Sequence, residues 1–118
     1  MLLVKSPQDP EYVSSPEVAE YKATLAEHGN GLNPDHAIVT SGYLQGEMLV
    51  ASMQGTDGCT RQDLLDAVYS PKDVEAGMLL PGITMNTGPE YPYLCTQAKV
   101  GTFDGTRYIL DHGLVEVE

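Results

Sequence analysis

The chain has 118 residues and is 42% hydrophobic, which is enough for one domain with a buried core. It carries 17 acidic and 6 basic residues, a net charge of -11, and this field repels phosphate backbones and anionic membrane surfaces. We therefore expect no nucleic-acid partner. No apolar run approaches the ~20 residues that span a bilayer. The apolar start is too short for the core of a signal peptide, so we expect any export signal to lie outside this chain.

The first predicted helix follows an extended loop that contains Ser6-Pro7 and Asp9-Pro10. Ser15 is suited to cap this helix, Pro16 to occupy its first position, and Gly29 to end it. One face carries apolar residues at helical spacing, namely Val18, Tyr21 and Leu25.

The second predicted helix runs from about Ser41 to Gln54. The β-branched run before it, Ala37 to Thr40, predicts a short extended or buried segment. Apolar residues cover most of the circumference of the helix, namely Tyr43, Leu44, Met48, Leu49, Val50, Ala51 and Met53. A helix with this pattern is buried on more than one side.

The third predicted helix begins after Thr60, with Asp63 placed for a capping box, and ends at Ser70-Pro71. Its expected core face consists of Leu64, Leu65, Ala67 and Val68.

The last part of the chain predicts a β-hairpin. Apolar and polar residues alternate from Leu94 to Phe103, and Asp104-Gly105 is a strong two-residue turn signal. Arg107 to Leu110 is the expected partner strand, and Leu114 to Val117 a last short strand.

The expected fold class is α/β, with three helices followed by a hairpin. Three helices and one hairpin do not close a core by themselves, because an apolar second helix needs a sheet to lie on. The open edges of the hairpin would also seek a partner. We therefore expect the fold to be completed by more polypeptide or by a second copy.

Few residues are suited to chemistry. The histidines His28, His36 and His112 lack metal-ligand spacing, and Asp63 and Asp66 share a helix face that looks solvated. The spacing of Cys59 and Cys95 fits no zinc site. The two cysteines could form a disulfide or could be two unrelated buried thiols. We expect no catalytic residue, no metal and no cofactor.

Tyr43 is the residue that the sequence singles out for binding. It lies in the first turn of the predicted second helix, after the extended segment, and clefts form at strand-to-helix junctions of α/β layers. A tyrosine offers both an apolar ring and a hydroxyl there. The alternative is an ordinary core tyrosine.

Five sets of residues also follow one another in an order and spacing that match a known family along nearly the whole chain. They are Lys5-Ser6-Pro7-Gln8-Asp9-Pro10 with Val18-Ala19-Glu20-Tyr21; Ser41-Gly42-Tyr43; Cys59-Thr60-Arg61 with Leu64-Leu65-Asp66-Ala67; Leu79-Leu80-Pro81-Gly82-Ile83-Thr84-Met85-Asn86-Thr87; and Phe103-Asp104-Gly105. Together they resemble the C-terminal third of the substrate-binding proteins of branched-chain amino acid ABC transporters. These are type I periplasmic binding proteins of the Leu/Ile/Val kind.

The resemblance implies a fold of two α/β lobes that close on a small solute, of which this chain would be the C-terminal segment. Residues 12–90 would be first-lobe helices, and residues 94–118 would hold a crossing and the second-lobe hairpin. The partners it implies are an amino-acid-like solute and a membrane permease, in the periplasm or another extracytoplasmic space. Ile38 would match an apolar pocket residue and Tyr43 an aromatic close to the cleft. The cysteine pair would be compatible with export.

Two other functions stay open at this point. The chain could belong to the ligand-binding domain of a sensor or receptor of the same fold, in which closure signals instead of delivering a solute. It could also be a standalone interaction module that forms a homodimer through its unpaired hairpin. In all three cases the chain is not an enzyme.

Overall fold

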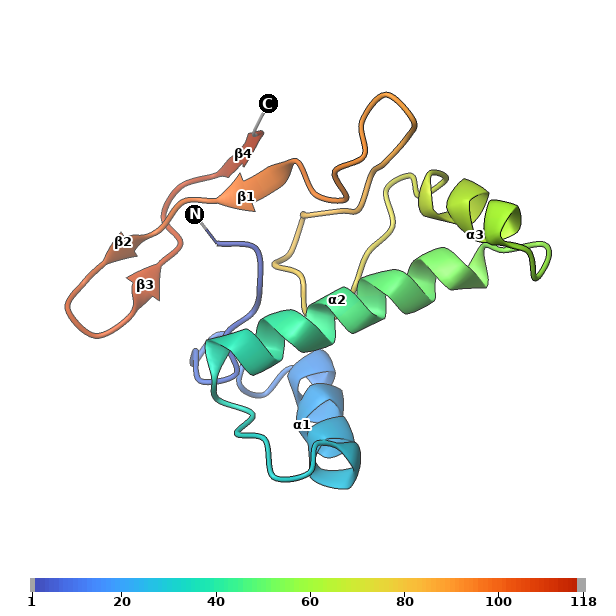
Figure 1. Cartoon of the computed structure of the whole chain (residues 1–118). Coiled ribbons are helices and arrows are strands. Elements are labelled where there is room, and N and C mark those ends of the chain that lie inside the picture. The colour runs from blue at the N-terminus through green and yellow to red at the C-terminus, as the bar shows by residue number, and fades with distance from the viewer. Residues whose placement is uncertain (1, 117–118) are drawn as a thin grey trace.

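The computed structural model describes residues 2–116. Within them, three helices precede four short strands, in the order that the sequence predicts (Figure 1). The elements are α1 (Pro16–His28), α2 (Ala37–Gln54), α3 (Arg61–Val68), β1 (Gln97–Lys99), β2 (Thr102–Phe103), β3 (Tyr108–Ile109) and β4 (Leu114–Glu116). The chain is therefore a mixture of helices and small antiparallel sheets. No helix among the described residues is both long enough and apolar enough to cross a membrane.

Helix α1 has the predicted bounds. The Ser15 side chain accepts a hydrogen bond from the backbone N–H of Val18, Pro16 is the first helical residue, and Gly29 follows the last turn. Val18 and Tyr21 are fully buried, which confirms the predicted core face at those two positions.

Helix α2 begins earlier than predicted. The expected extended segment from Ala37 to Thr40 is wrong, because these residues form the first turn of the helix. His36 caps the helix, and its Nδ1 accepts a hydrogen bond from the backbone N–H of Ile38 at 3.3 Å. The helical cost of a β-branched residue is below about 1 kcal/mol, so the contact of the buried Thr40 hydroxyl with that of Tyr21, at 3.2 Å, is enough to offset it.

Helix α3 packs against α2 and carries the predicted capping box. Thr60 accepts from the backbone N–H of Asp63, and the Asp63 carboxylate accepts from the backbone N–H of Thr60. Of the predicted core face, Ala67 is buried and Val68 half-buried, whereas Leu64 and Leu65 are exposed.

The predicted turn joins β2 to β3, but it is shifted by one residue. The backbone N–H of Asp104 donates to the carbonyl of Arg107 at 3.0 Å, so the two central residues are Gly105 and Thr106. Gly105 adopts a φ of +102°, a conformation that glycine adopts readily. The strand expected from Leu94 to Phe103 is shorter and divided in two. β1 pairs with β4 and touches Leu2 through a single bridge, while β2 pairs with β3. The break falls at Gly101, where an added Cβ would lie 3.0 Å from the Ile109 carbonyl oxygen. The expected last strand is present as β4, and Val117 lies outside the described residues.

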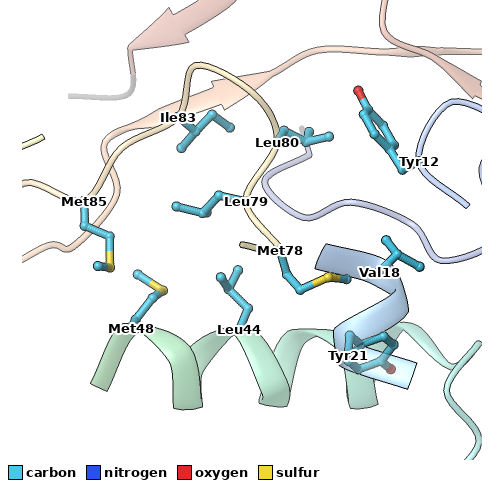
Figure 2. Close-up of a cluster of buried hydrophobic side chains, with 10 residues drawn as sticks. All are labelled: Tyr12, Val18, Tyr21, Leu44, Met48, Met78, Leu79, Leu80, Ile83 and Met85. Carbon is cyan, nitrogen blue, oxygen red and sulfur yellow. The ribbon is translucent and has the colours of Figure 1, made fainter. Parts of the chain in front are cut away.

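The core lies where α1 and α2 meet the irregular segment 78–85 (Figure 2). Its residues are Tyr12, Val18, Tyr21, Leu44, Met48, Met78, Leu79, Leu80, Ile83 and Met85. Half of them come from segment 78–85, which forms neither a helix nor a ladder. The N-terminal segment holds it in place, since the backbone N–H of Lys5 donates to Met78 and that of Leu80 donates to Leu3, each at 2.9 Å.

Helix α2 is fully buried along one face only, and Val39, Tyr43 and Ala51 beside that face are partly buried against the core. The buried residues repeat every four positions, namely Thr40, Leu44, Met48 and Ser52. On other sides, Ile38 is 76% exposed, and Leu49, Val50 and Met53 are each just over half exposed. The expectation that α2 is buried on more than one side is therefore wrong for the described residues. These side chains instead form an uncharged apolar surface of α2 that is exposed to solvent.

Candidate ligand-binding site

Both residues predicted to bind a ligand, Ile38 and Tyr43, lie in the first half of α2. They are five positions apart, so their side chains leave the helix axis in directions about 140° apart. Ile38 projects into solvent with 76% of its surface exposed, whereas Tyr43 packs against the core. The two side chains do not form one wall.

The ring of Tyr43 meets the ring of Tyr21 edge to face, with centroids 4.9 Å apart and planes at 73°. This is a favourable arrangement for an aromatic pair, worth about 1 kcal/mol beyond the apolar area that it buries. Tyr43 therefore helps to hold α2 on α1.

The hydroxyl of Tyr21 joins α1 to the start of α2. It donates to the backbone carbonyl of Pro34 at 2.7 Å and lies 3.2 Å from the hydroxyl of Thr40. The contact between the two side chains is buried, and the bond to the Pro34 carbonyl is partly buried. They fix the turn that precedes Ile38 as well as the first turn of α2. Sequence reasoning missed this contact, because nothing in the spacing of Tyr21 and Thr40 indicates that they meet.

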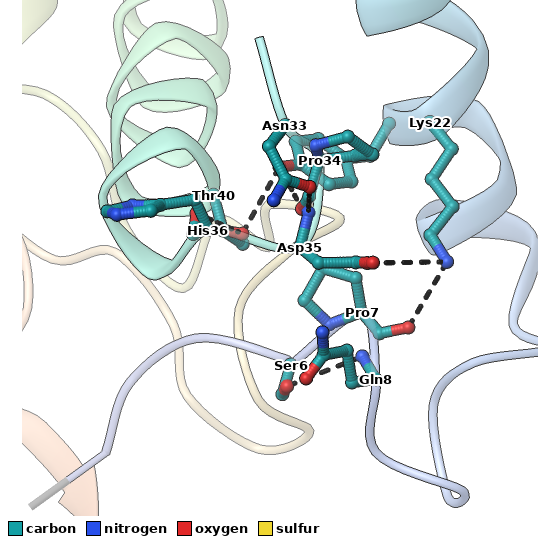
Figure 3. Close-up of polar contacts among 10 residues, drawn as sticks. Ser6, Pro7, Gln8, Lys22, Asn33, Pro34, Asp35, His36 and Thr40 are labelled. Carbon is teal, nitrogen blue, oxygen red and sulfur yellow. Dashed lines mark hydrogen bonds and ion pairs between the residues drawn. The ribbon is translucent and has the colours of Figure 1, made fainter.

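Lys22 ties the same turn from the other side (Figure 3). Its ammonium donates to the backbone carbonyl of Pro7 at 3.3 Å and lies 3.9 Å from the carboxylate of Asp35. Asn33 closes the turn by accepting from the backbone N–H of Asp35 at 3.0 Å. Ile38 is therefore exposed on a framework that three separate segments hold in place.

A second group of polar side chains surrounds Gly77. The ammonium of Lys5 is buried, donates to the Gly77 carbonyl at 2.7 Å and lies 3.5 Å from the carboxylate of Glu17. Glu47 accepts from the backbone N–H of Met78 at 3.0 Å. Burial raises the pKa of the Glu47 carboxyl. The pKa of the Glu17 carboxyl is lowered, chiefly by a hydrogen bond from its own backbone N–H.

The polar group around Gly77 stabilises the fold. Its charged atoms contact backbone groups of residues 77 and 78, and it anchors the start of the core segment to α1 and α2. Sequence reasoning missed it, although one signal was present: Glu47 is the only charged residue among the eighteen of α2.

The cysteines are not bonded to each other. Cys59 is exposed and Cys95 is half-buried, and burial raises the pKa of the Cys95 thiol. From residue 2 to residue 116, no group of three His, Cys, Asp or Glu side chains is placed to hold a metal ion.

Comparison with protein-family models, with curated proteins and with solved structures finds no match for this chain.

Proposed function

We propose that this chain is a segment of a non-catalytic solute-binding protein of an ABC-type importer. Its solute would be a branched-chain amino acid or a related small molecule, handed to a membrane permease outside the cytoplasm. The sequence resemblance motivates the proposal, and the setting of Ile38 supports it physically.

The supporting observation is an isoleucine that is 76% exposed on a backbone that hydrogen bonds hold in place. Burying an isoleucine side chain contributes about 1.5–3 kcal/mol, so leaving one in water forgoes a favourable contact. His36, Thr40 and Tyr21 fix the backbone on which Ile38 stands. A preorganised apolar side chain of this kind suits one wall of a site that a solute completes.

In this proposal Ile38 contacts the apolar part of the solute. Tyr43 acts as a positioning residue, because its ring holds α2 against Tyr21. The polar contacts to an amino acid's ammonium and carboxylate would come from the other lobe, which moves onto the solute on closure. The isolated chain should therefore bind free amino acids weakly.

A methyl-resolved NMR titration tests the proposal. Leucine is the ligand and glycine the matched control, since glycine has the same ammonium and carboxylate but no apolar side chain. We expect leucine to shift the methyl signals of Ile38 with millimolar affinity and glycine to leave them in place. Equal shifts with both ligands, or leucine shifts confined to residues remote from Ile38, would contradict the proposal. Micromolar affinity by calorimetry would also contradict it, because it would mean that this chain holds a complete site.

A second candidate function is self-association, and the uncharged face of α2 favours it. Leu49, Val50 and Met53 are half-exposed there, and a Cβ added at Gly42 or Gly46 would meet no other atom within 4 Å. A second helix could therefore approach closely. Sedimentation velocity over a range of concentrations separates the two functions, and Leu49→Ser should abolish any dimer that forms through this face.

A further inference from the structure

A cavity of about 440 Å³ lies between the N-terminal segment and the β2–β3 hairpin. Neither Ile38 nor Tyr43 lines it, so it is separate from the solute contact proposed above. Its volume lies within the range of roughly 300–1,000 Å³ that is usual for small-molecule sites.

The floor of the cavity is apolar and firmly packed. Leu80 and Tyr12 are 2% and 6% exposed, belong to the main core and lie side by side at one end of it (Figure 2). Burial, together with the neighbouring Glu11 carboxylate, raises the pKa of Tyr12 to about 12, so its hydroxyl stays neutral at physiological pH. The floor therefore offers a fixed, uncharged surface to a ligand.

The hairpin supplies an aromatic wall. Phe103 and Tyr108 face each other across β2 and β3 with ring centroids 5.2 Å apart, and each is just over half exposed. Two large rings left partly in solvent beside an apolar floor can gain contact area from a ligand that lies between them and the floor.

Arg107 places a positive charge at the edge of the cavity. Arg107 donates from Nη1 to the Asp9 carboxylate at 3.1 Å, and Asp9 also accepts from the backbone N–H of Glu11 at 2.9 Å. An arginine side chain has five N–H donors. Among residues 2–116, Asp9 is the only acceptor that bonds to the Arg107 guanidinium. The guanidinium is half-exposed and can donate further.

The charges around Arg107 disfavour an anionic ligand. Its positive charge is matched by Asp9. A second carboxylate, Asp104, lies nearby, and its pKa is lowered mainly by the backbone N–H groups of Arg107 and Thr106 and further by the Arg107 charge. The chain as a whole carries a net charge of -11. An oxygen acceptor without a charge avoids this repulsion and still accepts from the guanidinium.

We propose that this cavity binds a small uncharged amphipathic molecule. The apolar body of the ligand lies between the Leu80–Tyr12 floor and the Phe103–Tyr108 wall, and its hydroxyl or carbonyl oxygen accepts a hydrogen bond from Arg107.

Hexanol and hexanoate are the probes, because they share an alkyl chain and differ in the charge of the polar end. Both are titrated into the full chain and followed by amide and methyl NMR. We expect hexanol to shift the signals of Leu80 and of residues 103–110, and to bind about tenfold more tightly than hexanoate, a difference of about 1.4 kcal/mol. Hexanoate binding as tightly as hexanol, or hexanol shifts that miss the cavity, would overturn the proposal.

Two exposed positions allow substitutions that leave the core intact. Arg107→Gln and Tyr108→Ala should each weaken hexanol binding several-fold. The matched controls are Arg61→Gln and Tyr93→Ala, at exposed positions that do not line the cavity. Controls that weaken hexanol as much as the cavity variants would refute the site. Loss of hexanol binding would leave the leucine response of Ile38 unchanged, so the two proposals fail separately.

Discussion

Replacing Tyr21 with phenylalanine removes one oxygen from the contact that fixes the start of α2. The ring stays in the core and keeps its edge contact with Tyr43. The Pro34 carbonyl loses a partner at 2.7 Å and the Thr40 hydroxyl loses one at 3.2 Å. Thr40 retains a longer bond to the carbonyl of His36, so the carbonyl of Pro34 bears most of the loss. Pro34 is only half-buried, so water can replace part of the lost contact, and the expected loss of unfolding free energy is the net worth of one hydrogen bond, about 0.5–1.5 kcal/mol.

Urea unfolding followed by circular dichroism measures this loss, with Tyr43→Phe as the matched control. The Tyr43 contact with the core is made by its ring, so its variant should stay within about 0.5 kcal/mol of the wild type. Amide exchange should also rise at Ile38 in the Tyr21 variant. A Tyr21→Phe protein as stable as the wild type, or a Tyr43→Phe protein that loses as much, would refute the role assigned to the hydroxyl.

Three further outcomes are expected. Burial raises the pKa of Glu47 in the folded chain, so ionisation of its carboxyl opposes folding as the pH rises, and Glu47→Gln should gain stability relative to the wild type from acid to neutral pH. A difference that is independent of pH would contradict this. Thr60→Ala removes the α3 capping box and should cost about 1 kcal/mol, seen as faster amide exchange in α3 alone; unchanged exchange would count against the cap. A thiol reagent should modify exposed Cys59 before half-buried Cys95, and two equal rates would contradict the burial of Cys95.

The predictions that succeeded rest on chemistry within a few residues. Ser15 and Thr60 cap their helices because a hydroxyl reaches a backbone N–H three positions on, and this geometry does not depend on the rest of the fold. The hairpin turn forms at Gly105, one residue later than predicted, for a similarly local reason. The order of elements followed from such signals.

The predictions that failed depend on contacts between distant segments. The first turn of α2 has strand-like residues, and Thr40 is helical there because Tyr21, nineteen positions away, bonds to its side chain. Segment 78–85 has no period that marks it as core, yet it supplies half of the core cluster. The predicted site was split for the same reason, since the extended segment that would have carried Ile38 into a cleft is helical.

Paramagnetic relaxation by a soluble gadolinium chelate tests the most basic claim, that α2 has one covered face and one open apolar face. The chelate relaxes methyl groups that reach solvent. We expect strong relaxation of Ile38, Leu49 and Met53 and protection of Leu44 and Met48. Equal protection of all five would contradict the claim, and it would remove the physical support for a solute contact at Ile38.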